Sequence, residues 1–90
     1  MNIEKLTQIV NKYDPIHLIK MGLPNDEYQP EIADIFVALQ ERSMNEFELT
    51  EKIKEIFIRW FNETTVNDHG MEVYKNLAHE ILMEWKREQE

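Results

Sequence analysis

The sequence predicts an all-α fold, a small irregular bundle of four principal helices plus one short helix, in a single helical domain of residues 1–90. Three observations predict this class. Apolar residues recur at the three- and four-residue spacing of a helical face in several separate segments. The chain has only two glycines and three prolines, and they suit helix ends or connections. No six-residue segment alternates cleanly between apolar and polar side chains, as a half-buried strand would.

The first helix is predicted from about Asn2, a suitable N-cap, to Lys12. Ile9 is expected at the edge of its buried face. That face has the three-and-four spacing of one helical side. Its apolar members are Ile3, Leu6, Val10 and Tyr13.

A short helix is predicted next, over Pro15–Met21. Asp is a favoured N-cap, and proline is tolerated at the first helical position because its missing N–H would be unpaired there. The pair Asp14-Pro15 therefore suits a helix start. Gly22 is expected to end the helix in a left-handed conformation, which places Leu23 back against Leu18.

Two longer helices follow. The segment Asn25–Gln29 is read as a loop, and Pro30 as the first residue of a helix. The S-x-x-E pattern of Ser43–Glu46 predicts a capping box that opens a long helix reaching about Asn62. The apolar stripe of the former is Tyr28, Ile32, Ile35, Phe36 and Leu39. The main apolar face of the latter is Leu49, Ile53, Ile56, Phe57, Trp60 and Phe61.

The last helix is predicted from Met71 to about Arg87, after a connector over Asn62–Gly70 in which Thr65 or Asn67 would act as the cap. Its buried face comprises Met71, Tyr74, Leu77, Ala78, Ile81, Leu82 and Trp85. A few apolar residues do not fit the core of a monomer and point to association with another surface. They are Val37, Phe47, Ile58 and Met83.

The charge of the chain limits its partners. The net charge is −8, and residues 26–63 carry ten acids against four bases. Binding to phosphate backbones needs clustered Lys and Arg, so we expect no nucleic-acid partner. A basic protein surface would complement the negative field, although an acidic protein needs no partner to explain its charge.

The location is expected to be cytoplasmic. The chain has no cysteine, which excludes disulfides and thiolate zinc sites and fits a reducing compartment. The beginning of the chain has an early acid, Glu4, and no apolar run of signal-peptide length. The longest apolar-rich stretch, Ile56–Phe61, is interrupted by Arg59 and is too short to span a bilayer. We expect no membrane contact.

The segment between the first two long helices combines two helix breakers with an acidic-aromatic triplet. It reads Tyr13-Asp14-Pro15-Ile16, Gly22-x-Pro24 and Asp26-Glu27-Tyr28, followed by Glu31. This pattern resembles the YugE-like family of small uncharacterised bacterial proteins, whose sequences read approximately DPI-x-L-x-x-x-GAP-x-DEYD-x-E. The resemblance implies an all-helical bacterial cytoplasmic protein and no known activity. Two residues depart from the pattern: Leu23 replaces Ala, and Gln29 replaces Asp, which removes a carboxylate before Pro30.

The same segment supplies the candidate site. Tyrosine offers a rigid contact area and carboxylates complement a basic partner, so an acidic-aromatic patch is a plausible protein-binding surface. The alternative is a structural corner, in which Asp14 and the other acids cap helices and Tyr28 closes the loop over the core. The partner-binding candidates are Asp26, Glu27, Tyr28, Glu31 and Asp34.

Catalytic and metal-binding chemistry has weaker support. Glu27, Glu31 and Asp34 have spacings of four and three, so they would cluster if one helical surface continued through them, but the loop and Pro30 argue against that continuation. However, the Glu-x-x-His pairs of carboxylate di-metal bundles are missing from the sequence. His17, His69 and His79 do not have the spacing of a ligand pair. We therefore expect no cofactor, no metal and no catalytic residue.

Three functions remain open at this stage. The leading one is a non-enzymatic interaction or regulatory module that binds a basic protein through an acidic surface around Asp26–Asp34 and the edge of the long third helix. The second is a small metal-binding protein or enzyme that uses the acidic cluster of residues 26–34. The third is a purely structural homodimer. The oligomeric state is expected to be a monomer or a weak homodimer.

Overall fold

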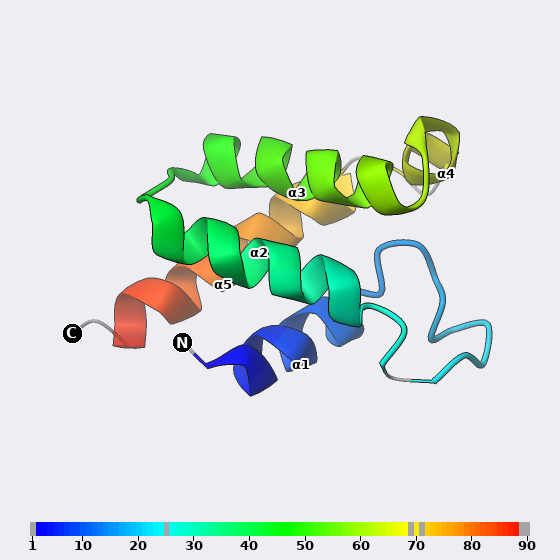
Figure 1. Ribbon diagram of the computed structural model, residues 1–90, viewed down its shortest axis with the longest axis horizontal. Coiled ribbons are helices and arrows are strands. Elements are labelled where there is room, and N and C mark those ends of the chain that lie inside the picture. Colours follow the sequence, from blue (N-terminus) through cyan, green and yellow to red (C-terminus); the bar gives the residue numbers. More distant parts are fainter. Residues whose placement is uncertain (1, 25, 69, 71, 89–90) are drawn as a thin grey trace.

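The computed structural model describes residues 2–24, 26–68, 70 and 72–88, and these residues form five α-helices without a strand. Four helices are long and one is short, which confirms the predicted class. In chain order the helices are α1 (Ile3–Tyr13), α2 (Gln29–Glu41), α3 (Glu46–Trp60), α4 (Glu63–Asp68) and α5 (Glu72–Glu88) (Figure 1).

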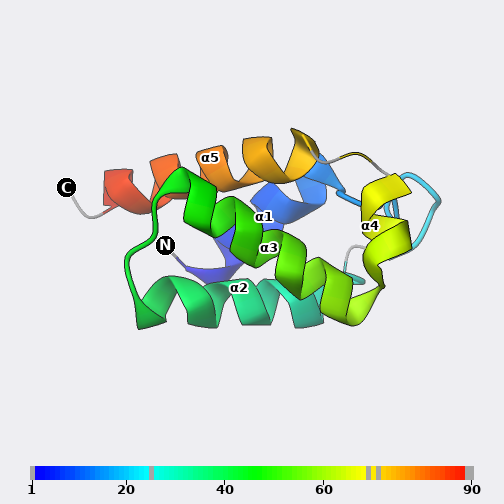
Figure 2. The same ribbon diagram turned by 90° about the horizontal axis from the view of Figure 1, so that it is seen from above.

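The four long helices pack around one interior. α3 lies along α5, α2 contacts both α1 and α3, and α1 also contacts α5 (Figures 1 and 2). The short helix α4 contacts α3 at one end of the bundle, the same end as the segment between α1 and α2. The α2–α3 connection and the end of α5 lie at the opposite end.

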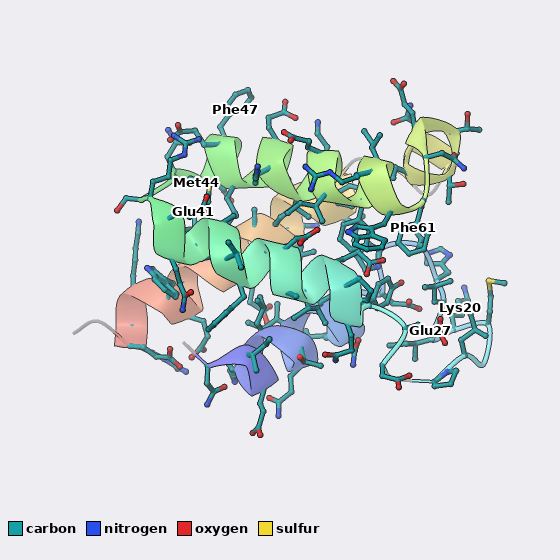
Figure 3. All side chains as sticks on the ribbon, viewed as in Figure 1. Lys20, Glu27, Glu41, Met44, Phe47 and Phe61 are labelled. Atoms are coloured by element: carbon teal, nitrogen blue, oxygen red, sulfur yellow. The ribbon has the colours of Figure 1, made fainter. Side chains whose placement is uncertain are left out.

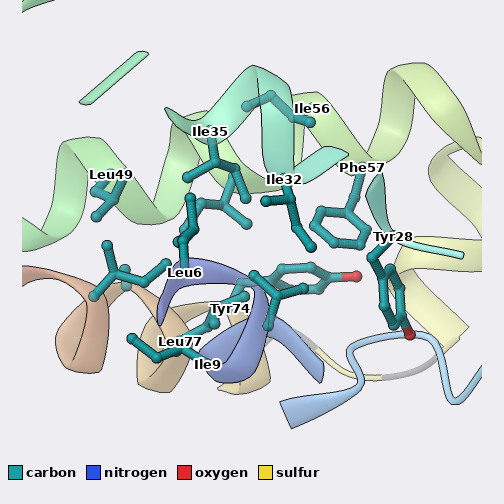
Figure 4. Packing of buried hydrophobic residues seen from close by; sticks show 14 of the residues in the cluster. Leu6, Ile9, Tyr28, Ile32, Ile35, Leu49, Ile56, Phe57, Tyr74 and Leu77 are labelled. Carbon is teal, nitrogen blue, oxygen red and sulfur yellow. The ribbon is translucent and has the colours of Figure 1, made fainter. Parts of the chain in front are cut away.

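The core is aliphatic with an aromatic cluster at one side. The Phe57 ring lies 5.9 Å from the Tyr28 ring and 5.6 Å from the Tyr74 ring, measured between centroids (Figure 4). Such tilted pairs add stability beyond the area that they bury. Every long helix contributes fully buried side chains, among them Leu6, Ile32, Ile35, Leu49, Ile53, Leu77 and Ile81.

The predicted short helix over Pro15–Met21 is wrong, because this segment is a series of turns. Asp14 and His17 have φ angles of 47° and 61°, and a right-handed helix cannot continue through left-handed residues. Asp14 is instead the C-cap residue of α1, and its backbone N–H donates to the Val10 carbonyl at 2.8 Å. The short helix of the bundle is α4.

The predicted end of this turn segment is confirmed. Gly22 has a φ angle of 91°, its N–H donates to the Ile19 carbonyl at 2.9 Å, and the Leu23 N–H donates to the Leu18 carbonyl at 3.0 Å. These two bonds are the pair that defines a Schellman motif. The left-handed conformation predicted for Gly22 is therefore correct, although no regular helix precedes it.

Two predicted helix starts need correction. Ser43 does not cap α3, because the capping box is formed by Asn45, whose side chain accepts from the Glu48 N–H at 2.8 Å. The predicted connector over Asn62–Gly70 contains helix α4, so Thr65 and Asn67 lie inside a helix and do not cap the last one; α4 begins after Asn62, whose side chain accepts from the Thr65 N–H at 2.8 Å. In both places an asparagine accepts the cap hydrogen bond, although serine and threonine are also favoured N-cap residues.

Most predicted core residues are buried, with three corrections. Ile9 is buried in the core instead of at its edge, while Ile3 and Trp60 are 41% and 49% exposed. Ile58 is partly buried against the core. Val37, Phe47 and Met83 are largely exposed, as predicted. Met71 lies outside the described residues.

Candidate functional site

The five candidate residues divide between the interior and the surface. Tyr28 is fully buried and Glu31 is 2% exposed, so neither presents its side chain to a partner. Asp26 and Glu27 are exposed, and Asp34 is half-buried. Asp26 and Glu27 lie in the turn before α2, while Asp34 lies in its second turn. Of the five predicted contact residues, only Asp26, Glu27 and Asp34 are accessible to a partner.

Tyr28 is the centre of a structural corner. Its hydroxyl donates to the Asp14 carboxylate at 2.6 Å and accepts from the Ile16 N–H at 3.2 Å and the Leu18 N–H at 3.4 Å. Burial and the bond to Asp14 raise the pKa of Tyr28 far above its usual value. The residue closes the loop over the core, as the structural alternative predicted.

Asp14 is the acceptor for several hydrogen bonds in the same corner. Besides the Tyr28 hydroxyl, its carboxylate accepts from the Ile19 N–H at 3.0 Å and the Lys20 N–H at 2.9 Å. Burial alone would raise the pKa of Asp14, but the bonds from Tyr28 and the two backbone amides outweigh it and hold the pKa below the usual 3.8. Asp14 therefore joins this segment to the end of α1, although it does not act as the N-cap that the sequence predicted.

Glu27, Glu31 and Asp34 share one side of α2 and the turn that precedes it. Burial raises the pKa of Glu31 above the usual 4.5, and the negative charges of Asp34 and Glu27 raise it further. The Oε2 atom of Glu31 is buried and has no hydrogen-bond partner among the described residues. Glu31 is therefore near enough to both other carboxylates for their charges to act on it, but one helical surface does not continue through all three, because Glu27 precedes α2.

Trp60 extends this cluster to α3. Its indole N–H donates to the Asp34 carboxylate at 2.8 Å, and Arg59 lies 3.9 Å from the same carboxylate. A tryptophan N–H usually has a polar acceptor, but this requirement does not identify Asp34 as the acceptor from the sequence. Figure 3 labels Glu27 beside α2 and Phe61 at the neighbouring end of α3. We call Asp26, Glu27, Asp34 and Trp60 the acidic corner.

The edge of α3 contributes less negative charge than the sequence predicted. Its carboxylates Glu48, Glu51 and Glu55 each have a basic partner within the chain, at 3.3 Å, 2.9 Å and 3.4 Å respectively. Those partners are Arg42, Lys54 and Arg59. Exposed pairs of this kind add little stability but offset the local charge. Asp26 and Glu27 have no such partner among the described residues.

The described histidines do not form a ligand cluster. His79 Nδ1 lies 3.0 Å from Glu46 Oε1 at the exposed surface, and His17 lies in the turn segment after α1. His69 lies outside the described residues. In the part of the chain that the structure describes, no group of three or more acidic or histidine side chains is arranged to hold a metal ion. The same residues contain no helix long and apolar enough to cross a bilayer.

Comparisons of the chain with models of protein families, with curated proteins and with solved structures found no match. The resemblance to the YugE-like family stays a prediction. The functional argument therefore depends on the geometry of the acidic corner and of the remaining surface.

Proposed function

We propose that this protein is a cytoplasmic, non-enzymatic interaction or regulatory module that binds a basic surface of a partner protein at the acidic corner. The observation that carries the proposal is the placement of Asp26 and Glu27, two exposed carboxylates without a basic partner in the described chain. Later in α2, Asp34 accepts from the indole N–H of half-exposed Trp60, and Arg59 lies 3.9 Å from the same carboxylate.

The chemistry of this corner suits a positively charged partner. Tryptophan is one of the residues that most often dominate binding energy at protein interfaces, and surrounding charges set orientation and association rate. Buried Glu31 adds to the negative potential under the corner when it is ionised. Lysine or arginine side chains of a partner would meet unpaired carboxylates and could stack on the exposed indole face.

A charge-matched comparison tests the proposal. The immobilised domain is exposed to extract of the source cell, and the bound protein is identified and purified. Its affinity is then measured for the wild type and for the double variant Asp26→Asn/Glu27→Gln. The control double variant, Glu4→Gln/Glu72→Gln, removes the same net charge from exposed positions in α1 and α5.

We expect the corner variant to weaken binding by about tenfold or more and the control variant to leave binding nearly unchanged. Binding by the wild type should weaken as salt is raised, because exposed charges are screened. Fluorescence of Trp60, isolated in a Trp85→Phe background, should change on binding. Equal loss in both double variants, or binding that salt and the corner variant leave unaffected, would contradict the proposal.

A further inference from the structure

Glu31 is the one charged residue in the described part of the chain that the fold buries almost completely. It lies in the first turn of α2, it is 2% exposed, and its Oε2 atom has no hydrogen-bond partner among the described residues. A buried carboxylate without a partner is costly when it is charged, and the cost falls when it holds a proton. The ionisation of Glu31 therefore depends on the charges around it.

Two carboxylates of the acidic corner are among those charges. Burial is the main reason that the pKa of Glu31 is raised, and the negative charges of Asp34 and Glu27 raise it further. Glu27 lies in the turn before α2, and Asp34 lies three residues after Glu31 on the helix. Glu31 and the corner therefore act on each other electrostatically, although Glu31 itself is not at the surface.

Helix α3, which packs against α2, does not neutralise Glu31. Two basic residues of α3, Lys52 and Arg59, line the same hollow as Asp34. Arg59 lies 3.9 Å from Asp34 and 3.4 Å from Glu55, and Lys52 lies 3.8 Å from Glu55. Neither cation is among the groups that act on the pKa of Glu31.

The other elements packed against α2 are α1 and the turn segment that joins the two helices. The titratable groups of α1 that bond to or act on Glu80 of α5 are Lys5, Lys12 and Tyr13. In the turn segment, the Asp14 carboxylate accepts from the Tyr28 hydroxyl and from two backbone amides, and His17 acts on Asp14. None of these groups acts on the pKa of Glu31, so among the described residues its charge is opposed by acids and balanced by no cation.

We propose that Glu31 couples binding at the acidic corner to pH, so that a basic partner binds the ionised form best and a protonated Glu31 releases its proton to solvent on binding. Cations of the partner would lie near Glu27 and Asp34, and positive charge there stabilises ionised Glu31. By thermodynamic linkage, the loss of the Glu31 proton strengthens binding by the same factor. This inference rests on the proposed function and adds its regulation.

The sign of the pH dependence follows from the order of the two titrations. The pKa of Glu31 is lower with the partner bound than without it, because the partner favours the charged form. The contribution of Glu31 to affinity therefore increases as the pH rises through the interval between those two values, and it is constant above and below that interval.

A titration of Glu31 in the full wild-type chain tests the inference directly. The probe is a tetra-arginine peptide with blocked ends, at low salt, and the carboxyl carbon resonance of Glu31 reports its ionisation from acid to neutral pH. We expect saturating peptide to move the midpoint of this titration to lower pH. The exposed Glu4 carboxyl on α1 is the internal control, and the peptide should not change its titration curve.

The affinity of the same peptide for the wild type and for Glu31→Gln gives a second readout. Glutamine has the shape of protonated glutamate and does not titrate, so the effects of all other carboxylates are common to both chains. As the pH falls through the titration of Glu31, wild-type affinity should decrease by about threefold or more relative to that of the variant. Calorimetry in buffers of different protonation enthalpy should show proton release by the wild type that Glu31→Gln lacks.

The outcomes separate this inference from the proposed function. A peptide that binds at the corner while the Glu31 midpoint stays unchanged would overturn the inference alone, as would equal pH dependence of affinity in the two chains. Binding that Asp26→Asn/Glu27→Gln leaves intact, or no binding by the wild type, would overturn the proposed function and this inference together.

Discussion

The Tyr28 hydroxyl donates a 2.6 Å hydrogen bond to the Asp14 carboxylate, and this bond joins the end of α1 to the start of α2. The bond is partly buried, and its acceptor is a carboxylate, which makes it a charge-assisted hydrogen bond. It explains why the acidic-aromatic segment contains a tyrosine at this position. Of the acidic-aromatic triplet, only Asp26 and Glu27 are exposed to a possible partner.

Removing the Tyr28 hydroxyl should destabilise the protein. In Tyr28→Phe the buried Ile16 N–H loses its acceptor and Asp14 loses a donor, so we expect a loss of about 1–3 kcal/mol in the free energy of unfolding. Thermal or urea unfolding measures it. Tyr74→Phe is a matched control, because the buried Tyr74 hydroxyl has no hydrogen-bond partner among the described residues. Tyr74→Phe should leave the free energy of unfolding unchanged or raise it. If both variants lose the same stability, the hydrogen bonds of the Tyr28 hydroxyl are not the cause of the loss.

Asp14 should contribute to stability in a pH-dependent way. Its folded-state pKa is lowered, so its contribution is present above the unfolded-state value near 3.8 and is lost as the pH falls through the folded-state pKa. Asp14→Asn keeps a residue that tolerates the left-handed conformation but loses charge-assisted bonds, and we expect a cost of about 1–3 kcal/mol at neutral pH. Urea unfolding at several pH values should show this difference shrinking toward acid pH. A difference that stays constant across the titration would rule out the carboxylate as its source.

The capping box of α3 gives a prediction about two neighbouring residues. Asn45→Ala removes the side-chain acceptor of the Glu48 N–H and should cost about 1 kcal/mol of stability. Ser43→Ala should have almost no effect, because the described cap hydrogen bonds are made by Asn45 and Glu48. Chemical unfolding of both variants compares the two positions directly. A larger loss for Ser43→Ala than for Asn45→Ala would restore the start that the S-x-x-E pattern predicted.

The four long helices could be predicted because their signals are local. Apolar spacing, the Asn2 cap and the Gly22 turn depend on residues within a few positions of one another, and the structure confirms all three. The segment over Pro15–Met21 could not be predicted in this way. There Asp14 could cap a helix or accept from Ile19, Lys20 and Tyr28, and the choice depends on where a tyrosine fourteen residues later is packed.

Only the part of the candidate site that depends on local spacing could be predicted from the sequence. The nearness of Glu31 and Asp34 on α2 follows from helical spacing, which is a local property. The burial of Glu31 does not, because charged residues seldom occupy the interior and the sequence offers no separate sign of it. The Trp60–Asp34 bond joins two helices, so neither residue alone indicates it. Local spacing therefore predicted that Glu31 and Asp34 are neighbours on α2 but not which of the acids a partner can reach.

Glu31 should be destabilising when it is ionised. Its Oε2 atom is buried without a hydrogen-bond partner among the described residues, and two neighbouring carboxylates oppose its charge. Because its folded-state pKa is raised, the protein gains stability relative to neutral pH as the pH falls through that value toward the unfolded-state 4.5. Glu31→Met preserves length and helix propensity while removing the charge, and should stabilise the protein by about 1–3 kcal/mol at neutral pH.

The pH dependence of the Glu31→Met effect separates charge from packing. The stabilisation should shrink below the usual glutamate pKa, since wild-type Glu31 is then neutral in both the folded and the unfolded state. Glu41→Gln, an exposed acid later in α2, is the control and should change stability by less than about 0.5 kcal/mol. Urea unfolding from acid to neutral pH measures both variants. If Glu31→Met destabilises the protein at neutral pH, the carboxylate supports the fold, and its buried charge cannot be a source of strain beneath the acidic corner.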